Sequence, residues 1–264
     1  MTISDLTAVF WESYKRSDRE LPVERITVHH VAGVGTAESI LQEFLTTPYE
    51  KSTNYCIGVD GRIGCCVPED YRAWTSGNWY NDQKAINIEV SNDVNGEPWS
   101  VSEASWNSLI ALCADICLRY GFRLEFSQAE PYQTLTAHRF FQATVCPGDW
   151  LYNRFPLLCE EVNDLIDMIE ELSKKVSYLD GAVKGLSGEL RELNKKTDLQ
   201  SSELAEHELQ VGIVADKVED VSKWARPTIN KMVEKGILAG TGTGLELNRI
   251  LMRVFVILDR LGCI

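Results

Sequence analysis

The chain of 264 residues lacks any long apolar run, and its first twenty residues lack a basic start followed by an apolar stretch. A membrane-spanning helix needs about 20 apolar residues in a row, and a secretory signal needs a basic start and an apolar core. We therefore expect synthesis in the cytoplasm without a signal peptide, and no membrane insertion. If the protein acts outside the cell, another factor must release it.

Basic residues are also scarce. The chain has 26 Lys and Arg against 39 Asp and Glu, which gives a net charge of −13 and an isoelectric point of about 4.8. Phosphate binding needs clustered Lys and Arg, so nucleic acid is not expected as the main partner. Disulfides are not expected either, although eight cysteines are present, because cytosolic thiols stay reduced and a chain of this length can build a core without cross-links. Cys113 and Cys117 have helical spacing and are expected to face the core as small hydrophobic side chains.

Residues 1–157 mix the patterns of strands and helices. Strands are predicted at residues 24–31, 55–59, 62–67 and 84–91, with a hairpin turn at Asp60-Gly61. Helices are predicted at residues 36–47 and 101–121, and the second has a capping signal near Ser102 and ends at Gly121. The sequence therefore predicts an α/β domain with a mixed central β-sheet flanked by helices.

A heptad repeat of apolar residues covers residues 162–221. The a positions are Val162, Ile169, Val176, Val183, Leu190, Thr197, Leu204, Val211 and Val218. The d positions are Leu165, Leu172, Leu179, Leu186, Leu193, Gln200, His207, Val214 and Val221. Only Thr197, Gln200 and His207 interrupt the apolar seam, and we interpret His207 as a device that sets register or specificity. The repeat predicts a coiled-coil spacer at residues 158–222, on the order of 90 Å long.

This seam needs a partner helix. Its β-branched a positions and leucine d positions favour a parallel homodimer. Gly181, Gly185 and Gly188 lie at the outer f, c and f positions, where they weaken the helix without breaking the seam. The alternative is that the segment bends near these glycines and pairs with itself.

Residues 223–264 predict a small helical module. One helix includes Pro227 and ends near Lys235, a Gly-rich turn follows, and Asn248 caps a second helix. The second helix is expected to place Val254, Phe255, Leu258 and Leu261 on one face. The glycines are not followed by Lys-Ser/Thr and no strand precedes them, so a phosphate-binding loop is not indicated.

Three of the four histidines, His29, His30 and His138, lie in the first region together with Cys146. A catalytic zinc has three protein ligands and one open position, and two imidazoles with one thiolate suit it. The spacing of His138 and Cys146 alone is more often structural than metal-binding. The alternation of a strand sends His29 and His30 to opposite faces, so the pattern does not decide which of them binds.

Glu89 lies in the middle of an apolar strand. Ile86, Ile88 and Val90 share one face of this strand, whereas Asn87 and Glu89 share the other. In one interpretation this is an edge strand with Glu89 in water. In the other, Glu89 points into a cleft, where desolvation raises its pKa and suits it to accept a proton from the attacking water.

Four segments carry a family resemblance: ITVHHVAG, STNYCIGVDGRI, AWTSGNWYNDQKAINIEVSND and TAHRFFQATVCPGDWLY. With these segments, residues 25 to about 156 resemble the zinc-dependent N-acetylmuramoyl-L-alanine amidases, which include phage lysozyme-amidases and animal peptidoglycan recognition proteins. The segments occur in the family's order and cover about half of the chain. The resemblance implies the amidase fold, bacterial peptidoglycan as the substrate, Zn²⁺ as the cofactor, and cleavage of the amide between the N-acetylmuramic acid lactyl group and L-alanine.

The resemblance also implies residue roles. His29, His138 and Cys146 match the zinc ligands, Glu89 matches the general base, and Thr144 matches the position that stabilises the oxyanion. Another branch of the family has a Tyr at the place of Thr53, and Tyr55 is expected to face the core instead. Substrate contacts are expected from four residues, and rim packing is the alternative for the two tryptophans: Asn54, Trp74, Asn78 and Trp79.

The C-terminal region resembles S-layer-homology wall-binding motifs more briefly. The shared features are Trp224-Ala225, a helix, the Gly-Ile-Leu-Ala-Gly stretch at residues 236–240, and a helix containing arginine. Together the three regions predict a phage endolysin for a Gram-positive host, with an amidase domain at 1–157, a spacer at 158–222 and a wall-binding module at 223–264. The alternatives are a non-catalytic peptidoglycan-recognition module on a coiled-coil adaptor and a structural adaptor with a vestigial head.

Overall fold

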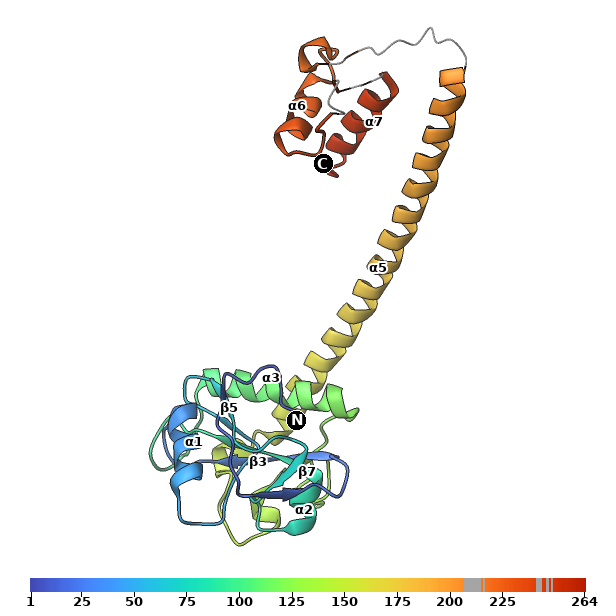
Figure 1. Ribbon diagram of the computed structural model, residues 1–264. Helices are drawn as coiled ribbons and strands as arrows, with labels where there is room; N and C mark the ends of the chain where they lie inside the picture. Colours follow the sequence, from blue (N-terminus) through green and yellow to red (C-terminus); the bar gives the residue numbers. More distant parts are fainter. Residues whose placement is uncertain (207–214, 216, 241–243, 246, 248) are drawn as a thin grey trace. The chain divides into compact units, whose positions relative to one another are not determined.

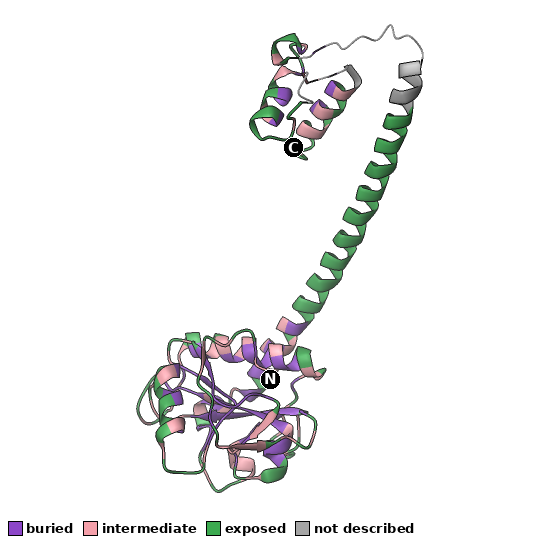
Figure 2. Ribbon diagram, in the orientation of Figure 1, coloured by how far each residue is buried: buried purple, intermediate pink, exposed green. Residues whose placement is uncertain are grey.

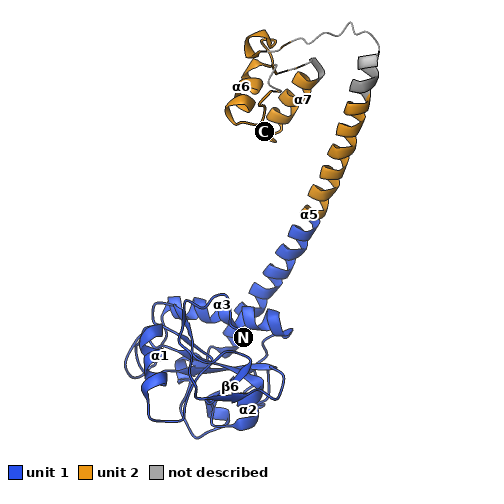
Figure 3. Ribbon diagram, in the orientation of Figure 1, with its two compact units in different colours: residues 1–178 blue, residues 179–264 orange. Residues whose placement is uncertain are grey.

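The computed structural model describes residues 1–206, 215, 217–240, 244, 245, 247 and 249–264 (Figure 1). The chain divides into two compact units, residues 1–178 and residues 179–264 (Figure 3). Within the described residues, no helix combines the length and the apolar character that a membrane crossing requires. His207 and Asn248, which carried predictions about register and capping, lie outside the described residues.

The first unit is built on a mixed six-stranded sheet, as the sequence predicts. Its order is β1 (Val9–Phe10), β5 (Ile63–Cys65), β4 (Tyr55–Ile57), β7 (Ala85–Val90), β3 (Arg25–His30) and β8 (Leu135–Ala137). The β4–β5 pair is antiparallel, as expected for the hairpin at Asp60-Gly61, and the other pairs are parallel. A second, two-stranded sheet pairs β2 (Arg16–Asp18) with β6 (Tyr71–Ala73).

The two faces of the large sheet differ in chemistry. One face buries the apolar positions of β3, β4 and β7 against α3 (Glu103–Tyr120) and the first turns of α5 (Phe155–Glu206). The opposite face packs Cys56 of β4 against α1 (Ala37–Thr46). Because side chains alternate along a strand, this second face also receives Thr27, His29, Asn87 and Glu89, which pair in register across β3 and β7.

Local signals explain the helix ends. Ser102 caps α3 by accepting a hydrogen bond from the backbone N–H of Ser105, and Gly121 ends it in the left-handed conformation at φ 77°. Gly has no Cβ to oppose this conformation. Cys113 and Cys117 are buried on the inner side of α3, as predicted. The short helices of this unit are α2 (Trp79–Lys84), η1 (His138–Phe140) and α4 (Asp149–Tyr152).

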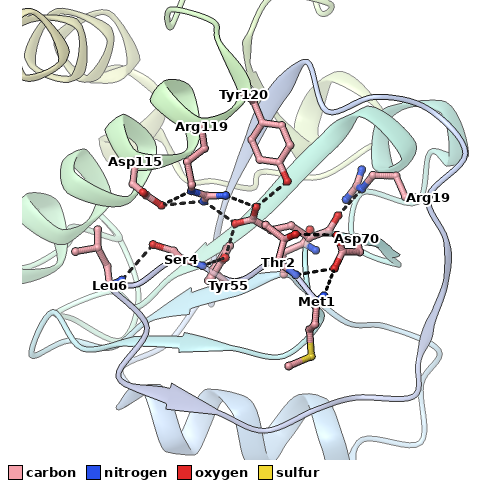
Figure 4. A network of polar contacts seen from close by, with 12 residues as sticks. Met1, Thr2, Ser4, Leu6, Arg19, Tyr55, Asp70, Asp115, Arg119 and Tyr120 are labelled. Atoms are coloured by element: carbon pink, nitrogen blue, oxygen red, sulfur yellow. Dashed lines mark hydrogen bonds and ion pairs between the residues drawn. The ribbon is translucent and has the colours of Figure 1, made fainter. Parts of the chain in front are cut away.

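Tyr55, Arg119 and Tyr120 belong to a network of polar contacts in the first unit (Figure 4), and all three hydrogen-bond Glu69. The Glu69 carboxylate is fully buried and accepts two hydrogen bonds from the guanidinium of Arg119, at 2.6 and 2.8 Å, and one from the hydroxyl of Tyr120 at 2.7 Å. The hydroxyl of Tyr55 also donates to it and accepts from the backbone N–H of Ser4 at 2.8 Å. Tyr55 therefore faces the interior, as predicted, and the network joins the N-terminal segment, β4 and α3.

The predicted heptad seam is exposed only in the middle of helix α5. Val162 and Ile166 are buried in the core of the first unit, so the first heptad is already covered. The a and d positions from Leu172 to Leu193 are all more than half exposed (Figure 2). The helix ends at Glu206. The two final seam positions do not lie on it, because Val218 belongs to the 3-10 helix η2 (Val218–Asp220) and Val221 is buried in the C-terminal cluster.

The described C-terminal residues form a small cluster around α6 (Arg226–Glu234) and α7 (Arg249–Arg260). Ile229 and Met232 of α6 pack with Met252 and Val256 of α7. The predicted apolar face of the second helix is partly wrong: Phe255 packs against the cluster, but Val254 and Leu261 are exposed. The buried face of α7 instead contains Met252 and Val256, which are four residues apart and therefore lie on one side of the helix.

Candidate metal centre and cleft

The structure brings together the three residues that the sequence predicts as metal ligands. One ligand atom from each of His29, His138 and Cys146 lies within 4.8 Å of the other two. His29 is near the end of β3, His138 directly follows β8, and Cys146 comes from the loop before α4. Because β3 and β8 are parallel neighbours, their carboxyl ends meet at one edge of the sheet, and residues 109 positions apart become adjacent.

His29, and not its neighbour His30, points at this cluster. The ring of His30 packs edge-on against Trp99 at a centroid distance of 5.4 Å. Its Nδ1 has no hydrogen-bond partner within the described part of the chain. The side chain of His30 lines the cleft.

The donor set fits a zinc ion. The Nδ1 of His29 lies 3.6 Å from the sulfur of Cys146, and a tetrahedral zinc with ordinary Zn–N and Zn–S bonds separates such a pair by about 3.5 Å. Burial, followed by the neighbouring His138, lowers the pKa of His29 to about 3, so this imidazole is neutral, as a ligand must be. Burial raises the pKa of Cys146 well above its usual value, and Glu89 adds to this effect. A thiolate here therefore needs a cation beside it.

Asn87 is a residue of this centre that the sequence did not single out. Its side-chain oxygen lies 3.0 Å from the Nε2 of His29. An amide oxygen can only accept, so Nε2 carries the proton and Nδ1 keeps its lone pair for a metal. The available signal in the sequence was an Asn at the centre of an apolar strand. Such a position is buried, as Asn87 is, and a buried amide requires polar partners.

Glu89 lies beside the metal centre, on the sheet face predicted for it. Its Cα pairs in register with that of His29 across β3 and β7. The half-buried side chain lines a cleft of about 210 Å³ together with His138, Thr75, Lys51 and other residues. Burial raises the pKa of Glu89 to about 8, Lys51 opposes this shift, and Glu43 adds to it. Lys51 is itself paired with Glu43 at 2.8 Å. The cleft interpretation of the Glu89 strand is therefore the one that the structure bears out.

Thr144 and Trp79 are two of the remaining predicted site residues. The hydroxyl oxygen of Thr144 accepts a hydrogen bond of 3.2 Å from the backbone N–H of Cys146, which holds it beside that ligand. Trp79 begins α2 and is half exposed. Asn78 caps this short helix by accepting a hydrogen bond from the backbone N–H of Asn81.

Two predicted substrate contacts use their polar atoms within the fold. Asn54 is fully buried, and its amide bonds the backbone of Val67 and Asn87 at 3.0 Å each. The indole N–H of Trp74 donates to the hydroxyl of Ser17 at 3.0 Å. Within the described residues, the lining of the cleft includes none of Asn54, Trp74, Asn78 and Trp79. The geometry therefore gives Asn54 a role inside the sheet and not at the substrate.

A family model described as N-acetylmuramoyl-L-alanine amidase matches residues 19–149. No match was found among curated proteins.

Solved structures with a similar fold include that of PlyL, with 16% sequence identity and a TM-score of 0.48; the match covers 58% of this chain and 95% of PlyL. The endolysine N-acetylmuramoyl-L-alanine amidase LysCS from Clostridium intestinale URNW has 19% identity and a TM-score of 0.41, and the match covers 56% of this chain and 93% of LysCS. An AmpD derivative has 20% identity and a TM-score of 0.44, and the match covers 60% of this chain and 99% of AmpD.

Proposed function

We propose that this chain, whose residues 19–149 belong to the N-acetylmuramoyl-L-alanine amidase family, hydrolyses the amide between the lactyl group of N-acetylmuramic acid and L-alanine in bacterial peptidoglycan. The observation that carries the proposal is the convergence of His29, His138 and Cys146 at one sheet edge, with Glu89 in the adjoining cleft. This arrangement offers a three-ligand metal site and a proton acceptor within one cavity, as metal-assisted hydrolysis requires.

The predicted metal ligands, Glu89 and Thr144 each have a part in this reaction. Zinc, when bound by His29, His138 and Cys146, supplies a Lewis acid that polarises the scissile carbonyl and makes water more acidic. Glu89 accepts the proton of the attacking water and returns it to the leaving amine. The raised pKa of about 8 suits a group that takes up and releases a proton near neutral pH. Thr144, placed next to Cys146, donates its hydroxyl to the oxyanion of the tetrahedral intermediate.

The direct test is hydrolysis of purified cell walls. Wild type loaded with zinc is expected to clear a cell-wall suspension and to release new L-alanine amino termini. Cys146→Ser is expected to lose both the activity and one zinc per chain, whereas Glu89→Ala keeps the zinc and loses the activity. Wild type that binds zinc but releases no amino groups would contradict the enzymatic proposal and favour a peptidoglycan-recognition module. Full activity in Glu89→Ala would show that another group accepts the proton.

The proposed biological setting is a phage endolysin that lyses a Gram-positive host. Two features support it: the amidase domain and the short C-terminal cluster around α6 and α7, which is proposed to bind the cell wall. A single small module of this kind binds weakly, and a second copy on the same particle would raise the avidity. Binding of a fusion of residues 215–264 to whole cells of Gram-positive and Gram-negative species, with amidase-free wall fragments as competitor, tests this part of the proposal.

We also propose that the middle of α5 pairs with a second copy of this chain. Its seam residues, among them Leu172, Leu179 and Leu186, are 59–66% exposed, and a regular seam of this kind is self-complementary in a parallel dimer. The g and e positions add one complementary pair between copies, Lys175 with Asp180. Sedimentation equilibrium of the full chain is expected to give a dimer for wild type and for the control Ser177→Glu. Leu179→Glu is expected to be a monomer. A monomeric wild type would contradict the pairing. The self-paired hairpin is not seen in the described part of the chain, because α5 continues as a helix through Gly181, Gly185 and Gly188.

A further inference from the structure

A buried carboxylate, that of Asp82, is linked to the candidate metal centre through intermediate residues. Among the described residues, it has no direct hydrogen bond with His29, His138 or Cys146. Asp82 lies on α2 and is 2% exposed. Its two oxygens accept hydrogen bonds from the backbone N–H groups of Thr75 and Ser76, at 3.1–3.3 Å, and from the side-chain amide of Asn87 at 3.3 Å. One of these donors, Asn87, also contacts the ligand His29, and another, Thr75, belongs to the cleft lining.

The first path from Asp82 runs to His29. Asp82 accepts from the amide nitrogen of Asn87 at 3.3 Å, and this bond turns the amide oxygen of Asn87 towards the Nε2 of His29, 3.0 Å away. Without an acceptor on its nitrogen side, the amide could rotate by half a turn and present N–H groups to His29. The carboxylate thereby selects the orientation of Asn87 that leaves the Nδ1 of His29 free for a metal.

The second path ends in the loop before α2. The backbone N–H of Ser76 donates to Asp82 at 3.1 Å. The hydroxyl of Ser76 accepts from the side-chain amide of the fully buried Asn81 at 3.2 Å. The loop that contains Thr75, a residue of the cleft lining, is thus held by α2.

We propose that Asp82 is a positioning residue of the metal centre, and that it orients His29 through Asn87. A metal-bound histidine usually has an outer partner on its second ring nitrogen, and here a buried carboxylate fixes the orientation of that partner. The inference rests on the proposed metal centre, but not on the hydrolysis of any substrate. It predicts that the imidazole of His29 loses its orientation when this carboxylate is changed.

A carboxylate is required because all of its neighbours are donors. Two backbone N–H groups and one amide N–H converge on Asp82, and an ionised carboxylate accepts at both oxygens. Asn at this position would keep one oxygen but place an NH₂ group against a donor. Asp82→Asn is therefore a substitution of nearly unchanged size that breaks the arrangement by its hydrogen-bond polarity alone.

The test measures zinc affinity of the full chain by competition with a chromophoric chelator. Asp82→Asn is expected to weaken zinc binding about 10–100-fold. Glu69→Gln is the matched control, because Glu69 is also a fully buried carboxylate but bonds Tyr55, Arg119 and Tyr120 instead. The control is expected to lose thermal stability and to bind zinc as wild type does. A fall in zinc affinity equal in both variants would overturn the inference, as would unchanged affinity in Asp82→Asn.

A double variant tests the path through Asn87. Asn87→Leu breaks this path, so Asp82→Asn in that background should weaken zinc binding further by a smaller factor than it does alone. Nitrogen-15 spectra of the metal-free imidazoles give an independent readout: Asn87→Leu and Asp82→Asn should each lose the single Nε2–H tautomer of His29. If Asp82→Asn does not fold, Asn87→Leu decides alone, because unchanged affinity and an unchanged His29 tautomer would overturn the inference.

The outcomes also separate this inference from the proposed function. Wild type that binds zinc but releases no amino groups from cell walls would end the enzymatic proposal and leave the test of Asp82 intact. Wild type that binds no zinc would overturn both. Zinc affinity that falls in Asp82→Asn and not in Glu69→Gln supports the positioning role, whether or not the substrate is the one proposed.

Discussion

Two glutamates of the first unit, one fully buried and one half-buried, have opposite surroundings. Glu69 accepts hydrogen bonds from Arg119, Tyr120 and Tyr55, so its charge is compensated inside the fold (Figure 4). Glu89 lines the cleft beside His138 and has no ion-pair partner among the described residues. Lys51, which also lines the cleft, pairs with Glu43 instead. The first arrangement stabilises a fold, whereas the second leaves a carboxylate ready to exchange a proton.

The largest expected effect separates the two glutamates by activity. Glu89→Gln should lower the rate of amide hydrolysis about 10²–10⁴-fold, because this is the usual contribution of a general base, while the zinc content stays at one per chain. Single-turnover release of L-alanine amino termini measures it. Glu69→Gln should keep the wild-type rate per folded molecule. A similar loss of activity in both variants would remove the distinction drawn here.

The next effect separates them by stability. Glu69→Gln should lower the free energy of unfolding by about 2–3 kcal/mol, because it leaves a guanidinium and two hydroxyls without their ionised acceptor. The value lies below the cost of breaking a fully buried pair because Arg119 is 29% exposed. Thermal denaturation of the full chain should show the loss as a melting temperature lower by roughly 5–10 °C in the transition of the first unit. An unchanged melting temperature would show that the network is dispensable.

A smaller effect concerns the pH dependence of the metal-free protein. The pKa of Glu89 is raised from an ordinary 4.5 to about 8 in the fold, so between these values the folded state holds a proton that the unfolded chain releases. Stability should therefore fall as the pH rises from about 4.5 to 8, and Glu89→Gln should not show this part of the fall. Urea denaturation of both proteins at several pH values measures the difference, and a difference that does not depend on pH would contradict the raised pKa.

The smallest effect tests the cation nearest to Glu89. Lys51 lowers the pKa of Glu89, so Lys51→Met should move the pH at which this stability is lost upwards, by less than about one unit because the side chain is 43% exposed and screened by solvent. Lys174→Met on the exposed side of α5 is the control and should move nothing. An unchanged pH would show that Glu43 already cancels the effect of Lys51 on Glu89, and a downward shift would contradict the assigned direction.

Much of the fold followed from the sequence, because strand alternation and local turn signals are short-range properties, whereas the ligand set of the metal centre followed from the family resemblance. The strands around His29 and Glu89 and the helix ending at Gly121 were predicted and are confirmed. The choice between His29 and His30 could not be made from the pattern. It depends on the register of β3 against β7 and β8, which joins residues more than 50 positions apart.

The residues that were not predicted depend on contacts that no local pattern records. Asn87 and Asp82 are polar residues whose partners lie across the sheet or in the preceding loop. Asn54 resembles a substrate contact in its segment, but its amide completes the bonding between β4 and its neighbours. The heptad pattern continues through Val221, but the described helix extends only to Glu206, and Val221 is buried in the C-terminal cluster.

The pairing of β3 with β8 also has a consequence for the order of folding. The hydroxyls of Thr27 and Thr136 meet at 2.8 Å across a sequence separation of 109 residues, and His29 meets Cys146 across 117. Contacts of such separation close a long loop and form late. On the ribosome, the chain therefore has its full set of ligands only after residue 146 has emerged, so that a nascent or truncated chain ending before residue 146 has the cleft glutamate but no complete metal site.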